Sequence, residues 1–371
     1  MMKEIINLPE VIQKTGTISK VLKINSYHET AKGYTLLLFT HTNSYPVYII
    51  KSFANEEYYD IIQNEYDNLN LLQKISDEEF KKSIPQPVYL GYSGDSCFLV
   101  QTGLSGFPMK SIRIKSIINL NRSSLRLLAE ITRWNLQFST LLAPRIEDSK
   151  SDLIEKIILN PIRQFNQFFG VSTEILSFIE KMADILIKYL NETVRLFYSH
   201  NDFCSSNILL SVNNSGIGVI DWEAKMAPQL PLLDLLHFYT CLAEDIHKKS
   251  SMNTASFFTT LHSFFFQRNR FSDFILNEIN QFNHEFSLSP SLVLPIYTMY
   301  WIKSALEKYN YFADKLKINF SEKSIKKVIW KSMEDEIKPF SSCRISEGKL
   351  LNIDFLLQNE RDFMIEKYGN S

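Results

Sequence analysis

The sequence predicts an α+β protein of two lobes, a small β-rich lobe at the N-terminus and a larger, mostly helical lobe at the C-terminus. β-branched and aromatic runs separated by turn residues lie mainly before residue 104, whereas apolar residues further along recur at helical spacing, as in 127–138. At 371 residues the chain also exceeds one ordinary hydrophobic core. We therefore expect a lobe over 1–104 that ends in a hinge, and a second lobe over 105–371.

Strands are predicted in the first lobe at 17–25, 34–42 and 45–53. Side chains alternate between the two faces of a strand, which places Lys51 on the same face as two apolar neighbours. An ammonium group on such a face requires an anion nearby. Lys51 is therefore a candidate for binding a carboxylate or a phosphate.

A helix is predicted to follow, with Asn55 as its N-cap. Its apolar residues recur at helical spacing, and Glu65 falls inside that stripe. An unpaired carboxylate on a buried face is costly, so Glu65 is expected to have a cationic partner. Lys51 is the residue that fits.

A hairpin is predicted near the middle of the chain, from strands at 208–212 and 217–220 joined by the turn residues 213–216. Asn207 and Asp221 are each seven residues from the centre of this turn, so we expect them roughly opposite each other in the ladder. Magnesium keeps several waters and takes few protein oxygen ligands. The open end of the hairpin is therefore a candidate magnesium site.

The residues just before the hairpin follow the pattern H-x-D-x-x-x-x-N, whose defining residues are His200, Asp202 and Asn207, and Ile-Asp-Trp-Glu follows at 220–223. Phosphoryl transfer needs one carboxylate to orient the attacking hydroxyl and oxygen ligands for magnesium. These motifs resemble the catalytic signature of the aminoglycoside phosphotransferase and choline kinase-like enzymes, which have a protein kinase-like fold.

The resemblance implies a role for each candidate residue. Asp202 would face the acceptor hydroxyl, while His200 would support the conformation of the loop. Lys51 and Glu65 would hold the α and β phosphates of ATP or GTP. Asn207 and Asp221 would bind Mg²⁺.

Three further segments are less specific. The predicted loop 26–33 has a single glycine, so no phosphate contact is assigned to it. The segment 102–106 has turn residues, and the resemblance implies a hinge that receives the adenine edge, although a plain linker fits equally. Asp234 lies in an apolar helical segment, and the resemblance implies that it braces the catalytic loop, with His200 as a possible partner.

Composition excludes several classes of protein. Hydrophobic residues make up 45% of the chain and charged residues 22%, which is typical of a folded protein, and the net charge of -1 gives no field for nucleic acid. The four cysteines lack metal-type spacing, which favours reduced thiols and a cytoplasmic location. No run reaches the ~20 apolar residues of a membrane span. The oligomeric state is left open.

The sequence thus predicts a Mg²⁺-dependent enzyme that transfers the γ-phosphate of ATP or GTP to a hydroxyl of a small molecule. The acceptor could be a sugar, an amino sugar, a choline-like amino alcohol or an aminoglycoside. Asn201 stands where many of the resembling aminoglycoside kinases have glycine, and choline kinase-like members often have asparagine. The rival hypothesis is a nucleotide-binding pseudokinase that serves as an interaction module, for which Asp202 would be unnecessary. Aromatic side chains that could face a quaternary ammonium group, or simply pack in the core, are Trp222, Tyr239, Tyr297, Tyr300 and Trp301.

Overall fold

The computed structural model divides into two compact units, each assembled from separate segments of the chain. The first unit contains the predicted strands together with the predicted catalytic segment, and the lobe boundary at residue 104 stays a prediction. The first unit comprises Met1–Ile117, Arg126–Ala143 and Tyr198–Ala227, and the second comprises Ile118–Leu125, Pro144–Phe197 and Pro228–Ser371. The structure describes residues 18–25, 33–54, 58–93, 96–112, 121–144, 146, 148–192, 195–211, 216–249, 264–265 and 269–316.

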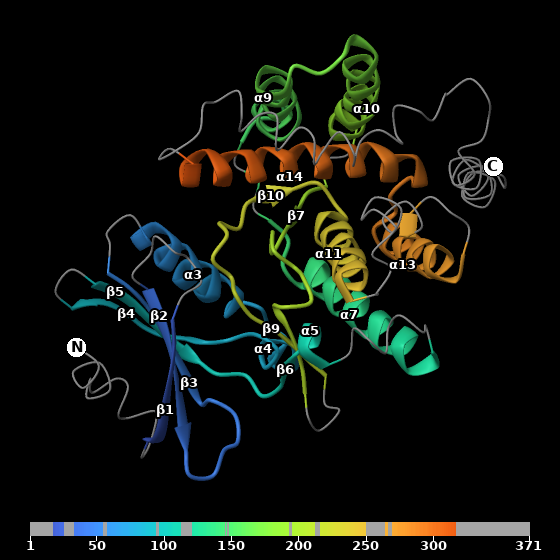
Figure 1. Cartoon of the computed structure of the whole chain (residues 1–371). Coiled ribbons are helices and arrows are strands. Elements are labelled where there is room, and N and C mark those ends of the chain that lie inside the picture. Colours follow the sequence, from blue (N-terminus) through green and yellow to red (C-terminus); the bar gives the residue numbers. More distant parts are fainter. Residues whose placement is uncertain are drawn as a thin grey trace. The chain divides into compact units, whose positions relative to one another are not determined.

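An antiparallel sheet of five strands, in the order β1-β2-β3-β5-β4, forms the N-terminal part of the first unit (Figure 1). The predicted strands of this lobe are confirmed, with two shifts: the strand predicted to end at Thr42 ends at Thr40, and the strand predicted from Tyr45 begins only at Tyr48. Pro46 has no N–H to donate to the ladder, which explains the later start. The strands are β1 (Ile18–Asn25), β2 (Gly33–Thr40), β3 (Tyr48–Phe53), β4 (Pro87–Ser93) and β5 (Ser96–Thr102).

The two faces of this sheet differ in character. Alternate residues of β2, β3 and β5 form a buried apolar cluster on one face. Lys51 pairs with Thr35 and Leu99 in the ladder, between the buried residues Ile50 and Ser52, and so points to the opposite face. The cluster consists of Leu36, Leu38, Tyr48, Ile50, Phe98 and Val100.

Helix α3 (Tyr59–Leu72) follows β3, and its buried residues recur at helical spacing, with Glu65 and Asn68 among them. Tyr58 occupies the N-cap position, while the predicted cap Asn55 lies outside the described residues. The other helices of this unit are α4 (Glu78–Lys81), α5 (Met109–Ile112) and most of α7 (Arg122–Leu141).

A second, three-stranded sheet of the first unit has the order β6-β8-β9 and consists of β6 (Phe107–Pro108), β8 (Ile208–Leu210) and β9 (Ile217–Val219). It contains the predicted hairpin, of which residues 212–215 lie outside the described part of the chain. Gly103 and Gly106 connect β5 to β6. A Cβ at Gly103 would overlap the Pro46 carbonyl oxygen, and Gly106 has a φ of +139°, so both positions of the predicted hinge require glycine.

The second unit is mainly helical, as predicted for the C-terminal lobe, and α14 packs against α9, α10 and α11 (Figure 1). No helix in the described part of the chain is both long and apolar enough to cross a membrane. The elements are α8 (Lys150–Ile154), the π-helical turn Glu155–Leu159, α9 (Asn160–Phe169), α10 (Thr173–Glu192), β10 (Pro228–Gln229), α11 (Leu233–Lys249), α13 (Arg270–Phe286), the 3₁₀ turn Pro290–Leu292 and α14 (Val293–Leu316). The short strand β7 (Phe197–Tyr198) contains the boundary between the two units, which falls after Phe197.

Candidate active site

Lys51 lies at the centre of the candidate site, and three carboxylates surround its ammonium group. Its Nζ lies 2.9 Å from Oε1 and 2.7 Å from Oε2 of Glu65, which confirms the ion pair expected from the sequence. The same Nζ lies 2.5 Å from Oδ1 of Asp221 and 2.9 Å from Oε1 of Glu223. The strand, the helix and the segment after β9 therefore meet at one cation.

The charges of this cluster shift the ionisation of its members. Burial alone would lower the pKa of Lys51, but attraction to the carboxylates outweighs it and holds that pKa well above its usual value. Burial raises the pKa of Glu65 to about 7, because Lys51 offsets only part of the cost and the other two carboxylates add repulsion. Three carboxylates share the single Lys51 ammonium. Glu65, the most buried of the three, is therefore the one whose ionised form is least stabilised.

The two outer acids respond in opposite directions. For Asp221, burial opposes ionisation, but Lys51 is close enough to hold the pKa below its ordinary value. Burial and the neighbouring Asp221 raise the pKa of Glu223 despite Lys51. Asp221 is therefore the member of this cluster whose negative charge is best stabilised.

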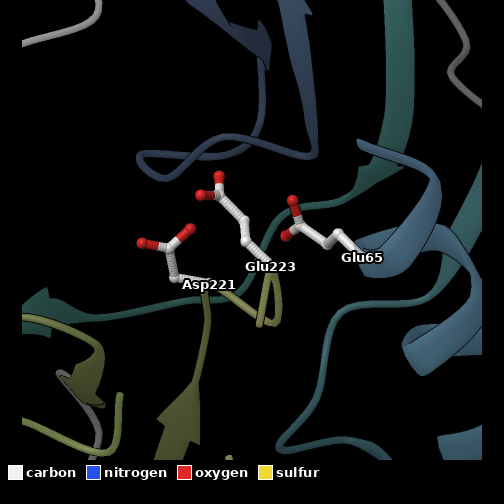
Figure 2. Close-up of side chains that lie close together, drawn as sticks. All are labelled: Glu65, Asp221 and Glu223. Carbon is white, nitrogen blue, oxygen red and sulfur yellow. The ribbon is translucent and has the colours of Figure 1, made fainter. Parts of the chain in front are cut away.

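The oxygen donors suit a hard divalent cation. Figure 2 shows Glu65, Asp221 and Glu223 directing their carboxylates toward one another, and one oxygen of each lies within 4.8 Å of the others. Oxygens about 2.1 Å from Mg²⁺ lie up to roughly 4 Å apart. The Lys51 ammonium lies among these three carboxylates, so the full set would hold the ion only after that ammonium moves away. Glu223 was missed as a site residue, although it ends the Ile-Asp-Trp-Glu motif and carries a carboxylate like Asp221.

Asp202 and Asn207 form a second pair at the site. Asp202 is exposed, and Nδ2 of Asn207 donates to its Oδ2 at 2.8 Å and to its backbone carbonyl at 2.9 Å. The five-residue spacing in the motif therefore lets the buried asparagine fix the position of the exposed carboxylate. The metal-binding role of Asn207 stays a prediction, for which its Oδ1 is the suitable atom.

The hairpin register differs by one residue from the prediction. Ile208 pairs with Val219, and the N–H of Ile220 donates to the carbonyl of Asn207, so the neighbour of Asn207 is Ile220 and not Asp221. Asp221 has a φ of +72°, a left-handed conformation that is uncommon outside glycine. This conformation ends the strand geometry, which is why simple alternation does not locate the Asp221 side chain.

His200 connects the two halves of the site through the backbone. Its Nε2 lies 3.0 Å from the Ile220 carbonyl oxygen, and its Nδ1 accepts the N–H of Asp202 at 3.3 Å. These partners indicate the neutral ring with hydrogen on Nε2. The supporting role of His200 stays a prediction, for which these contacts supply the geometry. Asp234 belongs to the other unit, and its bracing role also stays a prediction.

The backbone conformation of Asn201 explains why asparagine occurs at this position of the motif. It has a φ of +66°, and its Nδ2 donates to the Ser199 carbonyl oxygen at 3.1 Å. Glycine and asparagine are the residues that adopt this conformation most readily. The choice between them at this position therefore reflects the backbone and carries no information about the acceptor.

Buried aromatic rings pack next to both aspartates of the site, Asp202 and Asp221. Each of the two predicted site aspartates is followed by a fully buried ring, Phe203 after Asp202 and Trp222 after Asp221. Both rings pack against Trp134 of α7, with centroid distances of 5.5 Å and 6.4 Å. The segments that contain Asp202 and Asp221 are therefore both anchored by packing on the same ring, that of Trp134.

The aromatic residues considered for a quaternary ammonium group pack in the core instead. All five are at most 7% exposed, which agrees with the packing alternative. The described cysteines Cys97, Cys204 and Cys241 are free thiols, as expected, while Cys343 and loop residues 26–32 lie outside the described residues. The aromatic residues are Trp222, Tyr239, Tyr297, Tyr300 and Trp301.

Comparison with known proteins identifies the fold. No protein-family profile matches the sequence, and neither does any curated protein. Among solved structures, a choline kinase from Cryptosporidium parvum is 13% identical and matches over 96% of this chain and 100% of that chain with a TM-score of 0.51. A Ralstonia eutropha protein provisionally named an aminoglycoside phosphotransferase is 11% identical, over 87% of this chain and 93% of that chain, also with a TM-score of 0.51. The chain thus has the protein kinase-like fold of these proteins, as the sequence motifs suggested.

Proposed function

We propose that this protein is a phosphotransferase that moves the γ-phosphate of ATP or GTP to a hydroxyl of a small molecule, with Mg²⁺ bound. The observation that carries the proposal is the contact of Lys51 Nζ with both Glu65 and Asp221. It joins a residue suited to phosphates with one suited to a metal ion in a single site. The fold, which is that of small-molecule kinases, supports the same conclusion.

In this proposal the chain's own residues bind and orient the nucleotide. Lys51 donates to the α and β phosphate oxygens, and Glu65 keeps its ammonium in place. Asp221, Asn207 and Glu223 supply oxygen ligands for Mg²⁺, which neutralises charge on the phosphates when bound.

Asp202 orients the acceptor. Its exposed carboxylate, held by Asn207, accepts a hydrogen bond from the acceptor hydroxyl. As the hydroxyl oxygen bonds to the γ-phosphorus, the bond to the β–γ bridging oxygen breaks and the hydroxyl proton passes to Asp202.

The acceptor is proposed only as a class: a sugar, an amino sugar, a choline-like amino alcohol or an aminoglycoside. The name of the similar Cryptosporidium protein points to choline. The buried positions of the five aromatic residues give no support for choline over a sugar.

A phosphate-transfer screen tests the proposal. The purified protein is incubated with Mg²⁺, γ-labelled ATP or GTP and one member of each acceptor class, and labelled product is separated from free phosphate. We expect transfer to one class to exceed hydrolysis and to require Asp202. Nucleotide binding without transfer or hydrolysis in any combination would favour the pseudokinase instead.

A further inference from the structure

Asn68 of α3 is a buried residue whose amide is bonded entirely to the chain just after Asp221. Its Nδ2 donates to the carbonyl oxygens of Trp222 at 2.7 Å and of Ala224 at 2.8 Å. Its Oδ1 accepts the N–H of Met226 at 3.2 Å. With 6% of its surface exposed, the side chain exchanges few of these bonds with water.

Few other side chains could make these three bonds. An asparagine amide offers two N–H donors and a carbonyl acceptor on a short stem. An aspartate would turn an acceptor toward the Trp222 and Ala224 carbonyls, and a leucine would leave both carbonyls without a donor. The contacts therefore select for asparagine at position 68.

The position of Asn68 on α3 links these bonds to Lys51. Residues three apart lie on the same face of a helix, so Glu65 and Asn68 face the same side. Glu65 binds Lys51, while Asn68 binds the carbonyl of Trp222, which lies between Asp221 and Glu223 in the sequence. One face of α3 thus fixes both the lysine and the acidic segment.

The acidic segment needs such support because Asp221 has a left-handed backbone. A φ of +72° at a residue other than glycine persists only where neighbouring contacts hold it. On one side the Ile220 N–H bonds to Asn207, and on the other the Trp222 carbonyl bonds to Asn68. Loss of Asn68 removes the restraint that follows Asp221 directly.

We infer that Asn68 is a positioning residue that keeps the Asp221 and Glu223 carboxylates in register with Lys51, so that a divalent cation and the nucleotide phosphates bind together. The inference rests on the proposed function, because it assumes that these carboxylates bind the cation of a metal–nucleotide complex. If the inference holds, Asn68 determines how much Mg²⁺ increases the affinity for the nucleotide. It does not determine the affinity for the nucleotide without Mg²⁺.

The test is calorimetric titration of ADP, with and without Mg²⁺, into the full-length wild type and the Asn68→Leu and Asn68→Asp variants. We expect the enhancement by Mg²⁺ to fall by about tenfold, or roughly 1.4 kcal/mol, in both variants, while affinity for ADP alone stays within about twofold. Asn70→Leu is the matched control, because Asn70 is exposed on the same helix and its Nδ2 donates only within that helix, to the Tyr66 carbonyl.

The outcomes separate the inference from the proposed function. If wild-type protein binds no nucleotide with or without Mg²⁺, the proposed function fails. If the wild type shows enhancement by Mg²⁺ and folded Asn68 variants keep it, the positioning role is overturned. A parallel loss of affinity with and without Mg²⁺ would also overturn it, since that is the result of a merely structural residue. Asn68→Ser, which leaves room for water, replaces any variant that does not fold.

Discussion

Lys51 and Asp221 are 170 residues apart in the sequence, and their Nζ and Oδ1 atoms lie 2.5 Å apart. The same ammonium contacts Glu65 and Glu223, so three carboxylates share one positive charge. When all four groups are ionised, three negative charges and one positive charge leave a net charge of -2 at this point. That excess matches one divalent cation, and its repulsion adds to burial, which is the main cause of the raised pKa of Glu65.

Replacing Lys51 should leave the negative charges of the three carboxylates without their cationic partner. Lys51→Met is expected to lower the melting temperature at neutral pH, because removing one partner leaves uncompensated carboxylates. Mg²⁺ or Mn²⁺ without nucleotide should then raise the melting temperature of the variant more than that of the wild type, because the ion can replace the ammonium. Thermal unfolding over a metal titration measures this.

A charge change on the surface provides the control for that experiment. Lys82→Met removes an exposed lysine whose partner is Glu79, so it should leave both stability and metal response nearly unchanged. Equal metal responses of wild type and Lys51→Met would show that the three carboxylates do not act as a cation site.

The raised pKa of Glu65 predicts an effect of pH on stability. Between its ordinary value of 4.5 and about 7, the folded protein holds a proton on Glu65 that the unfolded chain releases. The stabilisation that the proton on Glu65 gives to the folded protein is therefore fully present below pH 4.5 and is lost as pH rises through about 7. The free energy of unfolding falls by up to about 1.4 kcal/mol per pH unit over this range. Glu65→Gln lacks the titration, so its free energy of unfolding should rise relative to wild type over this range and level off above it.

Urea unfolding at several pH values from 4.5 to 8 measures that difference. Glu79→Gln, at an exposed position of α4, is the control and should keep a constant difference from wild type. A difference between Glu65→Gln and wild type that is flat, or that falls as pH rises, would contradict the account of this carboxylate.

Removing the Asp221 carboxylate, which we propose binds the metal ion, should greatly reduce activity without unfolding the protein. The Asp221 side chain is 36% exposed, so Asp221→Ala leaves no large cavity. Turnover should fall roughly a hundredfold or more, since a bound metal ion contributes several kcal/mol to the transition state. Nucleotide turnover and circular dichroism of the same sample test this, and unchanged turnover in a folded variant would end the metal assignment of Asp221.

Nucleotide binding should be visible without any acceptor. A ligand at about 100 times its dissociation constant stabilises a protein by roughly 2.7 kcal/mol, so MgATP or MgGTP should raise the melting temperature. Lys51→Met should lose most of this shift, while Lys82→Met keeps it. If neither nucleotide moves the melting curve of the wild type, the phosphate-binding role of Lys51 is wrong.

Much of the site follows from local sequence rules. Alternation in β3 located Lys51, and a charged residue within an apolar helical stripe identified Glu65, because burial forces such a residue to find a partner. The same rule applied to Asn68, three residues later in the stripe, predicts a buried hydrogen-bond partner but not that the acidic segment supplies it. Glu223 could have been considered because it is a second carboxylate within the Ile-Asp-Trp-Glu motif.

Other features depend on contacts that local rules do not reveal. The hairpin prediction was off by one residue because it took Asn214 as the centre, whereas Ile208 and Val219, which pair, lie six residues before and five residues after it. The left-handed conformation of Asp221 is a separate feature that neither turn chemistry nor alternation encodes. The packing of Phe203 and Trp222 on Trp134 joins three distant segments, and no periodicity indicates which ring they share.

Asp202 is the residue on which the proposed chemistry depends. Asp202→Asn keeps the size of the side chain and can still accept the hydrogen bond from Asn207, but it removes the charge that would take the hydroxyl proton. The decisive measurement is kcat for phosphate transfer by purified Asp202→Asn, beside its melting temperature and its affinity for MgADP. We predict a fall in kcat of about a hundredfold or more, with stability and affinity close to wild type. Near-normal transfer by this variant to any acceptor that the wild type uses would contradict the central claim.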